Sequence, residues 1–423
     1  MSARMKHLTG AAALMVLLGV MQPVNVSAQT AFGIKWFGEI RPTAPPRTLA
    51  IGGISAVTPW GEEPVTLGQR NPALNAFSEK VLYGLTWELG RLSGSYGGET
   101  GTLWQYGPRM LGLILPLGGG VAVSANLHSL TYNEFEVHTS STMPDGVSRM
   151  YHNYIGTGGL SEGSFSLAWR LPSGALALGV STDLIFGSIK HEWAVTFDSA
   201  GYVNTRDQVY RQHKGHRMTA GVQVEPIPSL RIGAALSNRG ELNIKHIYST
   251  VGSISDTSEG KLQPAGTMVV GAGFSLTDKW AVYLDYNRVS WDRAEWIEEP
   301  VQPSGSPVGI ADIGLLTAES DIGIGFERRT PPVDQQIRFI DTIPLRAGVR
   351  LGTFYAPDTS GDAVKKWYGT LGTALDIGRE GRTWADLTLQ FGSYSTSGDA
   401  HEFFWRVQIG ITGAERWFLP PQR

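Results

Sequence analysis

Apolar and polar residues alternate along most of the chain beyond residue 80. In residues 402–412, for example, every second position from 403 to 411 is aromatic or branched aliphatic, and the residues between them include Arg406 and Gln408. A period of two is that of a β-strand with one apolar face. Most of these segments are roughly ten to sixteen residues long, enough to cross a bilayer, whereas strands in soluble proteins average about 5–6 residues. The pattern therefore predicts an all-β protein, a transmembrane antiparallel β-barrel of about 14 strands.

Turn-forming residues between these segments give the strand boundaries. We predict strands near residues 81–96, 103–117, 120–135, 163–171, 174–191, 208–225, 229–239, 265–276, 280–291, 319–328, 343–355, 367–378, 384–394 and 402–413. Aromatic residues near strand ends, expected as interfacial girdles, are Trp104, Tyr106, Trp280, Trp291, Trp367 and Trp384.

The connections between the predicted strands alternate in length. Short turns are expected at 118–119, 172–173, 226–229, 277–279 and 379–383, and long polar loops near 136–162, 192–207, 240–264, 292–318 and 356–366. Short periplasmic turns alternating with long extracellular loops are typical of barrels in the bacterial outer membrane. The connection 329–342, with Pro331-Pro332, should be short in this scheme and is not.

The first 28 residues have the features of a secretory signal peptide. Arg4 and Lys6 precede an apolar run that begins at Leu8, and small residues at 26–28 form a cleavage site. The run is shorter than the about 20 residues that a transmembrane helix needs. The chain contains no cysteine, which excludes a lipid anchor on cysteine, disulfides and thiolate metal sites. We therefore predict an exported protein whose mature chain starts at residue 29.

Composition narrows the class of protein further. Glycine accounts for 53 of the 423 residues, 17% of the residues are charged, and no run of 18 apolar residues follows the signal. A membrane protein built from helices would contain such runs. The net charge is −3 and no basic patch stands out, so we expect no nucleic-acid partner.

Charged residues within the predicted strands fall on the face opposite the apolar one. A cation on the lipid face at the bilayer midplane costs about 2–4 kcal/mol, so these side chains are expected to point into the lumen. The predicted lumenal charges are Glu88, Asp183, Asp285 and Asp386, together with Arg170, Arg346, Arg350 and Arg406. Ion pairs between them either fill and stiffen the interior, which we favour, or guide a substrate through it.

About fifty residues of the mature chain precede the first strand, more than a tether requires. Asn71 followed by Pro72 has the form of a helix start and predicts a short helix over 72–79. A barrel of this size has room for such a segment as a plug. The expected regions are a signal peptide (1–28), an N-terminal hatch (29–80), the transmembrane barrel (81–413) and a C-terminal tail (414–423).

Short motifs in the hatch and in the barrel resemble those of the long-chain fatty acid transporter family. The matching residues are Arg47 to Gly53, Asn71-Pro72-Ala73, Pro264, Asp285-Tyr286, Trp291 and Ile343 to Gly348. The resemblance implies a fourteen-stranded barrel closed by an N-terminal hatch, with a lumenal pocket for hydrophobic molecules and a lateral opening in the wall. It also implies that the hatch geometry is set by Gly52, Gly53, Asn71, Pro72 and Ala73.

Two departures from that family bear on function. The family's lateral exit lies at a kink in the third strand, whereas residues 121–137 contain neither Gly nor Pro. The chain also ends on Leu419-Pro420-Pro421-Gln422-Arg423 instead of a terminal aromatic residue. The sequence therefore does not place the exit. The same superfamily includes barrels that serve secretion machines, and fold alone does not separate these roles.

No local motif marks an active site or a metal site. His213 and His216 have no carboxylate at a metal-ligand spacing, and the stretch from Asp358 to Asp362 has too few ligands for calcium. We therefore expect no enzymatic activity, no metal and no cofactor.

These observations predict a monomeric outer-membrane protein, in contact with membrane lipids, for passive uptake of hydrophobic small molecules such as fatty acids or aromatic hydrocarbons. Trp36, Phe37 and Trp60 are the candidate apolar contacts for a substrate. The alternative is a non-transporting scaffold or shuttle barrel that binds a secreted or surface protein.

Overall fold

The computed structural model of the protein describes residues 30–415 with short gaps. The gaps are residues 35, 42–43, 61–66, 68–69, 97–98, 144–147, 200, 251–255, 302–312, 331–342, 359, 378–382 and 399. The predicted signal peptide, most of the predicted tail and nearly all of the 329–342 connection therefore lie outside the described residues.

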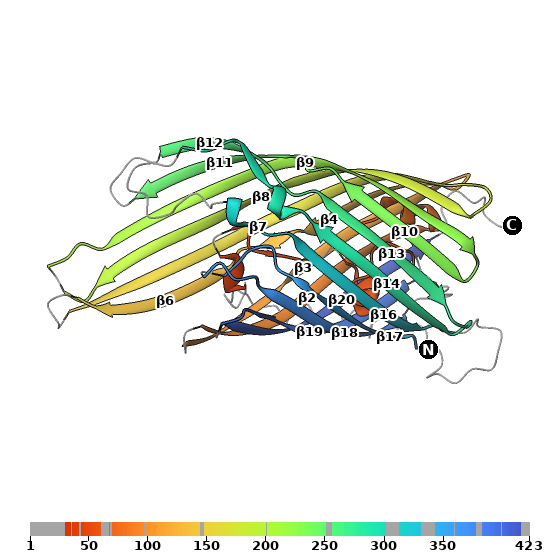
Figure 1. Ribbon diagram of the computed structural model, residues 1–423. Helices are drawn as coiled ribbons and strands as arrows, with labels where there is room; N and C mark the ends of the chain where they lie inside the picture. The colour runs from red at the N-terminus through yellow and green to blue at the C-terminus, as the bar shows by residue number, and fades with distance from the viewer. Residues whose placement is uncertain are drawn as a thin grey trace, which may run out of the picture.

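Fourteen antiparallel strands close into a barrel, which confirms the predicted fold class (Figure 1). In ring order the strands are β2 (Val81–Tyr96), β3 (Glu99–Gly118), β4 (Val121–Ser129), β7 (Arg149–Arg170), β8 (Leu176–Phe197), β9 (Thr205–Ile227), β10 (Leu230–Ser237), β13 (Thr267–Ser275), β14 (Trp280–Val289), β16 (Glu319–Arg328), β17 (Leu345–Thr353), β18 (Lys365–Asp376), β19 (Thr383–Ser395) and β20 (His401–Glu415). Each strand pairs with the next, and β20 returns to β2, where Val81 lies opposite Glu415. Closure satisfies the backbone hydrogen bonds that lipid cannot satisfy.

The two faces of the barrel wall differ as the sequence pattern requires. In β16, Ile322, Ile324 and Phe326 are exposed on the outer face, whereas Asp321 and Glu327 are buried inside. The same alternation holds along β8, where burial and exposure change at every residue from 177 to 186. An apolar outer belt around a polar interior is typical of barrels in the bacterial outer membrane. The protein is therefore located in the outer membrane.

The ring strands are of very unequal length. β7, β8 and β9 contain 22, 22 and 23 residues, whereas β10 contains 8 and β13 contains 9. The excess projects from one end of the barrel as a sheet together with β6 (Phe135–Thr142), β11 (Glu241–Thr250), β12 (Asp256–Gln263) and β15 (Glu295–Glu298) (Figure 1). This projection lies at the end opposite the short turns, and we call it the extracellular sheet.

The extracellular sheet corrects part of the loop prediction. Residues 136–162, 192–207 and 240–264 are largely β-strand, not loop. Their sequence lacks a sustained apolar face because water, rather than lipid, surrounds a strand beyond the membrane. In β6, for instance, every residue after Phe135 is exposed. The strand count of the ring was predictable because only the ring strands carry the lipid-facing alternation.

The N-terminal segment, residues 30–80, lies inside the barrel (Figure 1). It contains η1 (Ala31–Gly33), β1 (Glu39–Ile40), the short helix α2 (Pro46–Ala50) and the 3-10 helix η2 (Pro72–Phe77). α2 packs against β17 to β20, and η2 packs against β4, β7, β8 and β9. Two further 3-10 helices, η3 (Trp291–Arg293) and η4 (Ile313–Leu315), lie between β14 and β16. Within the described part of the chain, no helix has the length and apolar character needed to cross a membrane.

The third strand of the sequence is interrupted between β4 and β6. After Ser129 the chain leaves β3, and Thr131–Tyr132 forms β5, which pairs with Glu39–Ile40 of β1 inside the barrel. The chain then rejoins the wall at Phe135, opposite Gly156 of β7. The third strand thus turns inward to bind the N-terminal segment.

Candidate functional site: the filled lumen and its cavity

Gly52 and Gly53 fix the N-terminal segment to the barrel wall. Both have positive φ angles, of 82° and 74°, which favour glycine. Their carbonyl oxygens accept hydrogen bonds from Arg350, at 2.8 and 3.0 Å. Arg350 also pairs with Asp285, whose carboxylate accepts from the Ser55 N–H at 2.8 Å. The structure therefore brings two predicted lumenal charges together with two predicted hatch residues.

Asn71 holds the second half of the segment. Its Oδ1 accepts from the Ala73 N–H at 3.1 Å, which caps the 3-10 helix that starts at Pro72. Its Nδ2 donates to the carbonyls of Ala56, at 2.8 Å, and of Val222 on β9, at 3.0 Å. The predicted helix over 72–79 is thus a shorter 3-10 helix, and its cap doubles as an anchor to the wall.

The wall carries glycines where the segment touches it. A Cβ built on Gly221 would clash with Oδ1 of Asn71, and one built on Gly348 would clash with the backbone nitrogen of Gly52. The close approach of the N-terminal segment, through the Asn71 side chain at Gly221 and through its backbone at Gly348, leaves no room for a side chain at either position. The N-terminal segment is therefore in close contact with the barrel wall and is not loosely enclosed by it.

The eight predicted lumenal charges form two pairs among themselves. Asp386 pairs with Arg346 at 3.0 Å, and Asp285 pairs with Arg350. The others find partners that the sequence reasoning did not name: Glu88 with Arg41 and Arg109, Asp183 with Arg217, Arg170 with Glu225, and Arg406 with Glu39. Two of these partners, Glu39 and Arg41, come from the N-terminal segment, so the network joins segment and wall.

Glu39 is one of the fully enclosed members of this network, at 1% exposure. Burial alone raises its pKa, but the Arg406 and Arg41 guanidinium groups outweigh burial and lower the pKa to about 2. Tyr394 donates a further hydrogen bond to it at 2.7 Å. Glu39 is therefore a fixed negative charge that binds the N-terminal segment to β19 and β20.

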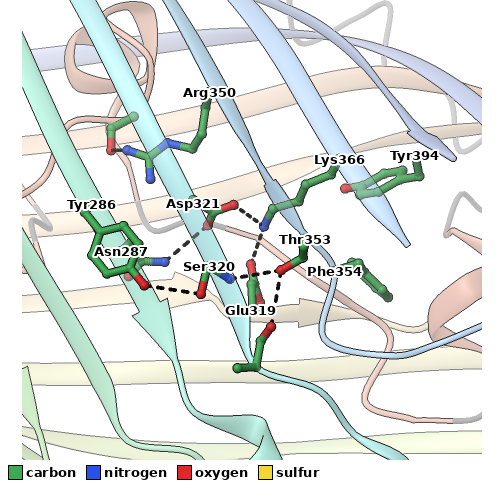
Figure 2. A network of polar contacts seen from close by, with 12 residues as sticks. Tyr286, Asn287, Glu319, Ser320, Asp321, Arg350, Thr353, Phe354, Lys366 and Tyr394 are labelled. Carbon is green, nitrogen blue, oxygen red and sulfur yellow. Dashed lines mark hydrogen bonds and ion pairs between the residues drawn. The ribbon is translucent and has the colours of Figure 1, made fainter. Parts of the chain in front are cut away.

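A second polar network was missed by the sequence reasoning (Figure 2). Lys366 reaches Asp321, at 2.9 Å, and Glu319, and Asp321 also accepts from Asn287 at 3.3 Å. The group lines a polar cavity beside the N-terminal segment, whose empty volume of about 640 Å³ includes the part that opens to solvent. Glu319 is the first residue of β16 and Lys366 the second residue of β18, where the apolar alternation that identified lumenal positions has not yet begun.

The inward turn of the third strand is held by contacts rather than by glycine or proline. The Arg41 N–H donates to the Leu130 carbonyl at 3.2 Å, and the Leu160 N–H donates to the Thr131 hydroxyl at 3.0 Å. The ring of Tyr132 lies between two guanidinium groups, 4.9 Å from that of Arg41 and 5.3 Å from that of Arg109. The absence of Gly and Pro from residues 121–137 therefore did not exclude a break in this strand.

The turn leaves part of the wall unpaired. Within the described residues, the ladder between β3 and β4 begins at Met110, and residues 99–109 of β3 pair with β2 alone. β6, on the far side of the break, pairs with β7 alone. The barrel wall is therefore interrupted beside β3, next to Leu130 and Thr131.

A large cavity lies between the N-terminal segment and the strands from β4 to β14. Its empty volume is about 1240 Å³, including the part that opens to solvent. Leu130 and Thr131 of the broken strand belong to its lining, so the cavity reaches the interruption in the wall. Apolar residues of the lining include Phe37, Leu160 and Trp291.

The three candidate substrate contacts, Trp36, Phe37 and Trp60, have different surroundings in the structure. Phe37 lines the large cavity and stacks on Trp291, with ring centroids 5.4 Å apart. Trp36 is buried in the same apolar cluster as Phe37, whereas Trp60 packs on Tyr283 in a separate apolar cluster. Trp291 itself was expected in the interfacial girdle, and this prediction is wrong because η3 turns the residue into the lumen.

With this geometry in place, comparison with known protein families matches residues 5–422 to BamG. The chain belongs to the BamG family. Comparison with curated proteins finds no match.

Solved structures of channels share the fold of this BamG-family protein. The CymD monoaromatic hydrocarbon channel is 14% identical over 89% of this chain and 99% of its own, with a TM-score of 0.57. The Pseudomonas putida toluene transporter TodX is 13% identical, covers 88% and 97%, and has a TM-score of 0.54. A Pseudomonas aeruginosa FadL homologue is 11% identical, covers 88% and 99%, and has a TM-score of 0.60. The predicted resemblance to fatty acid transporters is therefore confirmed at the level of the fold.

Proposed function

We propose that this protein is a monomeric outer-membrane channel for the passive uptake of hydrophobic small molecules, such as long-chain fatty acids or aromatic hydrocarbons. In this proposal residues 29–80 act as a hatch, and the large cavity receives the substrate. Phe37 is the contact residue among the three aromatic candidates, because it lines that cavity.

The observation that carries the proposal is the interruption of the wall at the third strand. A closed barrel with a filled bore would offer a hydrophobic molecule no way into the membrane. Here the cavity lining includes Leu130 and Thr131. Within the described residues, residues 99–109 of β3 pair with β2 on one side and have no strand partner on the side of β4. A hydrophobic molecule in the cavity would thus have a lateral route to lipid, without crossing the charged network deeper in the lumen.

The folds of CymD and TodX support the proposal, since these proteins are a monoaromatic hydrocarbon channel and a toluene transporter. At 13–14% identity they supply the architecture, and the case for substrate passage depends on the cavity and the break.

A matched pair of variants on β7 tests the proposal. Leu160 is buried and lines the cavity, whereas Leu167, on the same strand, is 50% exposed on the lipid face. We expect Leu160→Trp to reduce uptake of radiolabelled oleate or toluene several-fold in intact cells that lack the native gene, and Leu167→Trp to leave it unchanged. Wild-type protein that gave no more uptake than an empty vector would refute the proposal.

One observation favours the alternative, a scaffold that binds a secreted or surface protein. The extracellular sheet projects well beyond the ring, and β6 has a ladder partner on one side only within the described residues. A free edge of eight residues without Lys or Pro is suited to pairing with another chain. Normal uptake by a variant lacking this projection would separate the two functions.

A further inference from the structure

Six hydroxyl side chains form a continuous row across the wall of the large cavity. They are Ser124, Ser166, Ser181, Thr219, Ser237 and Thr267, one each from β4, β7, β8, β9, β10 and β13. Each lies directly opposite the next in the strand register, and all six line the cavity. Barrel closure does not require this repetition, since other lumenal positions on these strands range from Ala and Gly to Asp and Arg.

The row presents hydrogen-bond acceptors to the cavity. Ser181 and Thr219 both donate their protons to Asp183, at 3.1 and 2.9 Å. Since a hydroxyl has one proton, each of these oxygens faces the cavity with lone pairs only.

Asn75 of η2 adds a further acceptor. Its amide nitrogen donates to Ser124 and Ser166, at 3.0 and 2.8 Å, and its Oδ1 is buried without a hydrogen-bond partner. Asn75 is 3% exposed and lines the same cavity. A buried acceptor without a donor is costly, and a ligand that donates a hydrogen bond would satisfy it.

The charges beside the row disfavour an anionic ligand. Asp183 and Glu162 share one guanidinium group, that of Arg217. Glu162 also lies 3.3 Å from Nε2 of His128, a further residue of the lining. Arg70, the other arginine of the lining, donates to Asn287 at 2.6 Å and lies near the Glu319 and Asp321 carboxylates. A carboxylate headgroup placed on the row would face acceptors and negative charges, whereas a neutral hydroxyl-bearing group would donate to them.

The rest of the cavity is apolar. On β7 and β8, Leu160 and Ile185 lie six and four residues beyond the hydroxyl row, toward the extracellular side. At about 3.3 Å per residue, this places the apolar end about 13–20 Å from the row, the length of a medium acyl chain. The cavity is therefore amphipathic along its length.

We propose that the large cavity binds an uncharged amphiphile, with a hydroxyl-bearing headgroup on the hydroxyl row and an apolar tail between Phe37, Leu160 and Ile185. The proposal rests on the proposed function and names the chemical class of its ligand.

Three probes with one identical brominated C12 tail test the proposal: a monoacylglycerol, the methyl ester and the free carboxylate. The full-length mature protein is placed in lipid nanodiscs, and the part of the fluorescence quenching that is lost in Trp291→Phe reports occupancy of the cavity. We expect the monoacylglycerol to bind at least about tenfold more tightly than the other two, which corresponds to one or two additional hydrogen bonds.

Substitutions in the row sharpen the test. Thr267→Val and Thr219→Val should each weaken monoacylglycerol binding about fivefold and leave the methyl ester unaffected, whereas Thr219→Ser should bind like wild type. Thr182→Val, on the lipid face of β8, is the control. Should Thr219→Val fail to fold, Thr267→Val remains informative, because the described residues give its hydroxyl no partner.

Each other outcome has a definite meaning. Equal binding of all three probes, or tightest binding of the carboxylate, would overturn the hydroxyl-row proposal and leave hydrophobic uptake standing. Absence of binding by every probe would overturn both.

Discussion

At the scale of single residues, the lumen is organised by contacts between the N-terminal segment and the wall. Parity along a strand was enough to predict that Asp285, Arg346 and Arg350 point inward, because the cost of charge in lipid leaves one choice. It could not predict that Arg406 pairs with Glu39. Glu39 lies in a segment without periodicity, and its position depends on how that segment folds inside the barrel.

The wall glycines give the first prediction. Gly221→Ala places a methyl group against Oδ1 of Asn71, and the segment must shift to make room. We expect a loss of about 1–3 kcal/mol in the free energy of unfolding, as for other overpacked sites, measured by urea titration in lipid vesicles. Gly101→Ala, where a Cβ meets nothing within 4 Å, is the control, and equal stability of the two variants would contradict the close seating.

The second prediction concerns pH. The pKa of Glu39 is lowered from 4.5 to about 2 in the folded protein, so its stabilising effect is complete above about pH 4.5 and is lost as the pH falls toward 2. Glu39→Gln removes one partner of a buried ion pair, and we expect it to cost about 3–5 kcal/mol at pH 7. The stability difference between wild type and Glu39→Gln should be constant from pH 6 to 8 and shrink below pH 4.5. A stability difference that grew on acidification would contradict the lowered pKa of Glu39.

At the scale of elements, the interrupted third strand is the feature that the sequence could not reveal. Strand breaks are usually read from Gly or Pro, and residues 121–137 contain neither. The break depends instead on β1, which pairs with β5, and on Arg41 and Arg109 around Tyr132. These partners are 23 or more residues away in sequence, so no local pattern encodes the turn.

The third prediction follows from the Thr131 hydroxyl, which accepts from the Leu160 N–H at 3.0 Å. Thr131→Val leaves that buried donor unpaired, at a cost of about 1–3 kcal/mol. We expect faster hydrogen exchange in the peptides that carry β1 and β5, measured by mass spectrometry, with unchanged exchange in β16 to β19. Uniformly faster exchange over the whole barrel would contradict a local role for the turn.

The fourth prediction concerns the hairpin of β11 and β12. β10 pairs directly with β13, and Ser237 lies opposite Thr267, so a short turn can replace residues 241–263 without opening the ring. We expect this variant to remain a folded, heat-modifiable barrel that takes up hydrophobic substrate. Loss of uptake with the barrel intact would assign a transport role to the hairpin. Loss of the barrel itself would contradict the fourteen-strand ring as the stable unit.

At the scale of the whole molecule, the sequence predicted the barrel because one physical constraint repeats along it. Every ring strand has to present an apolar face to lipid. The resulting alternation of apolar and polar residues can be recognised in the sequence without a structure. The strands of the extracellular sheet could not be predicted in this way, since strands surrounded by water need no apolar face toward lipid. The path of the N-terminal segment through the lumen was likewise predictable in outline only, as a segment too long for a tether.

The central claim is that this segment closes the bore of a membrane-spanning barrel, and single-channel recording in planar bilayers tests it most directly. We predict that the mature wild-type protein gives no large steady conductance, whereas a variant that lacks residues 30–70 and keeps the barrel fold gives a stable, open pore. Equal conductance of the two proteins would contradict the account.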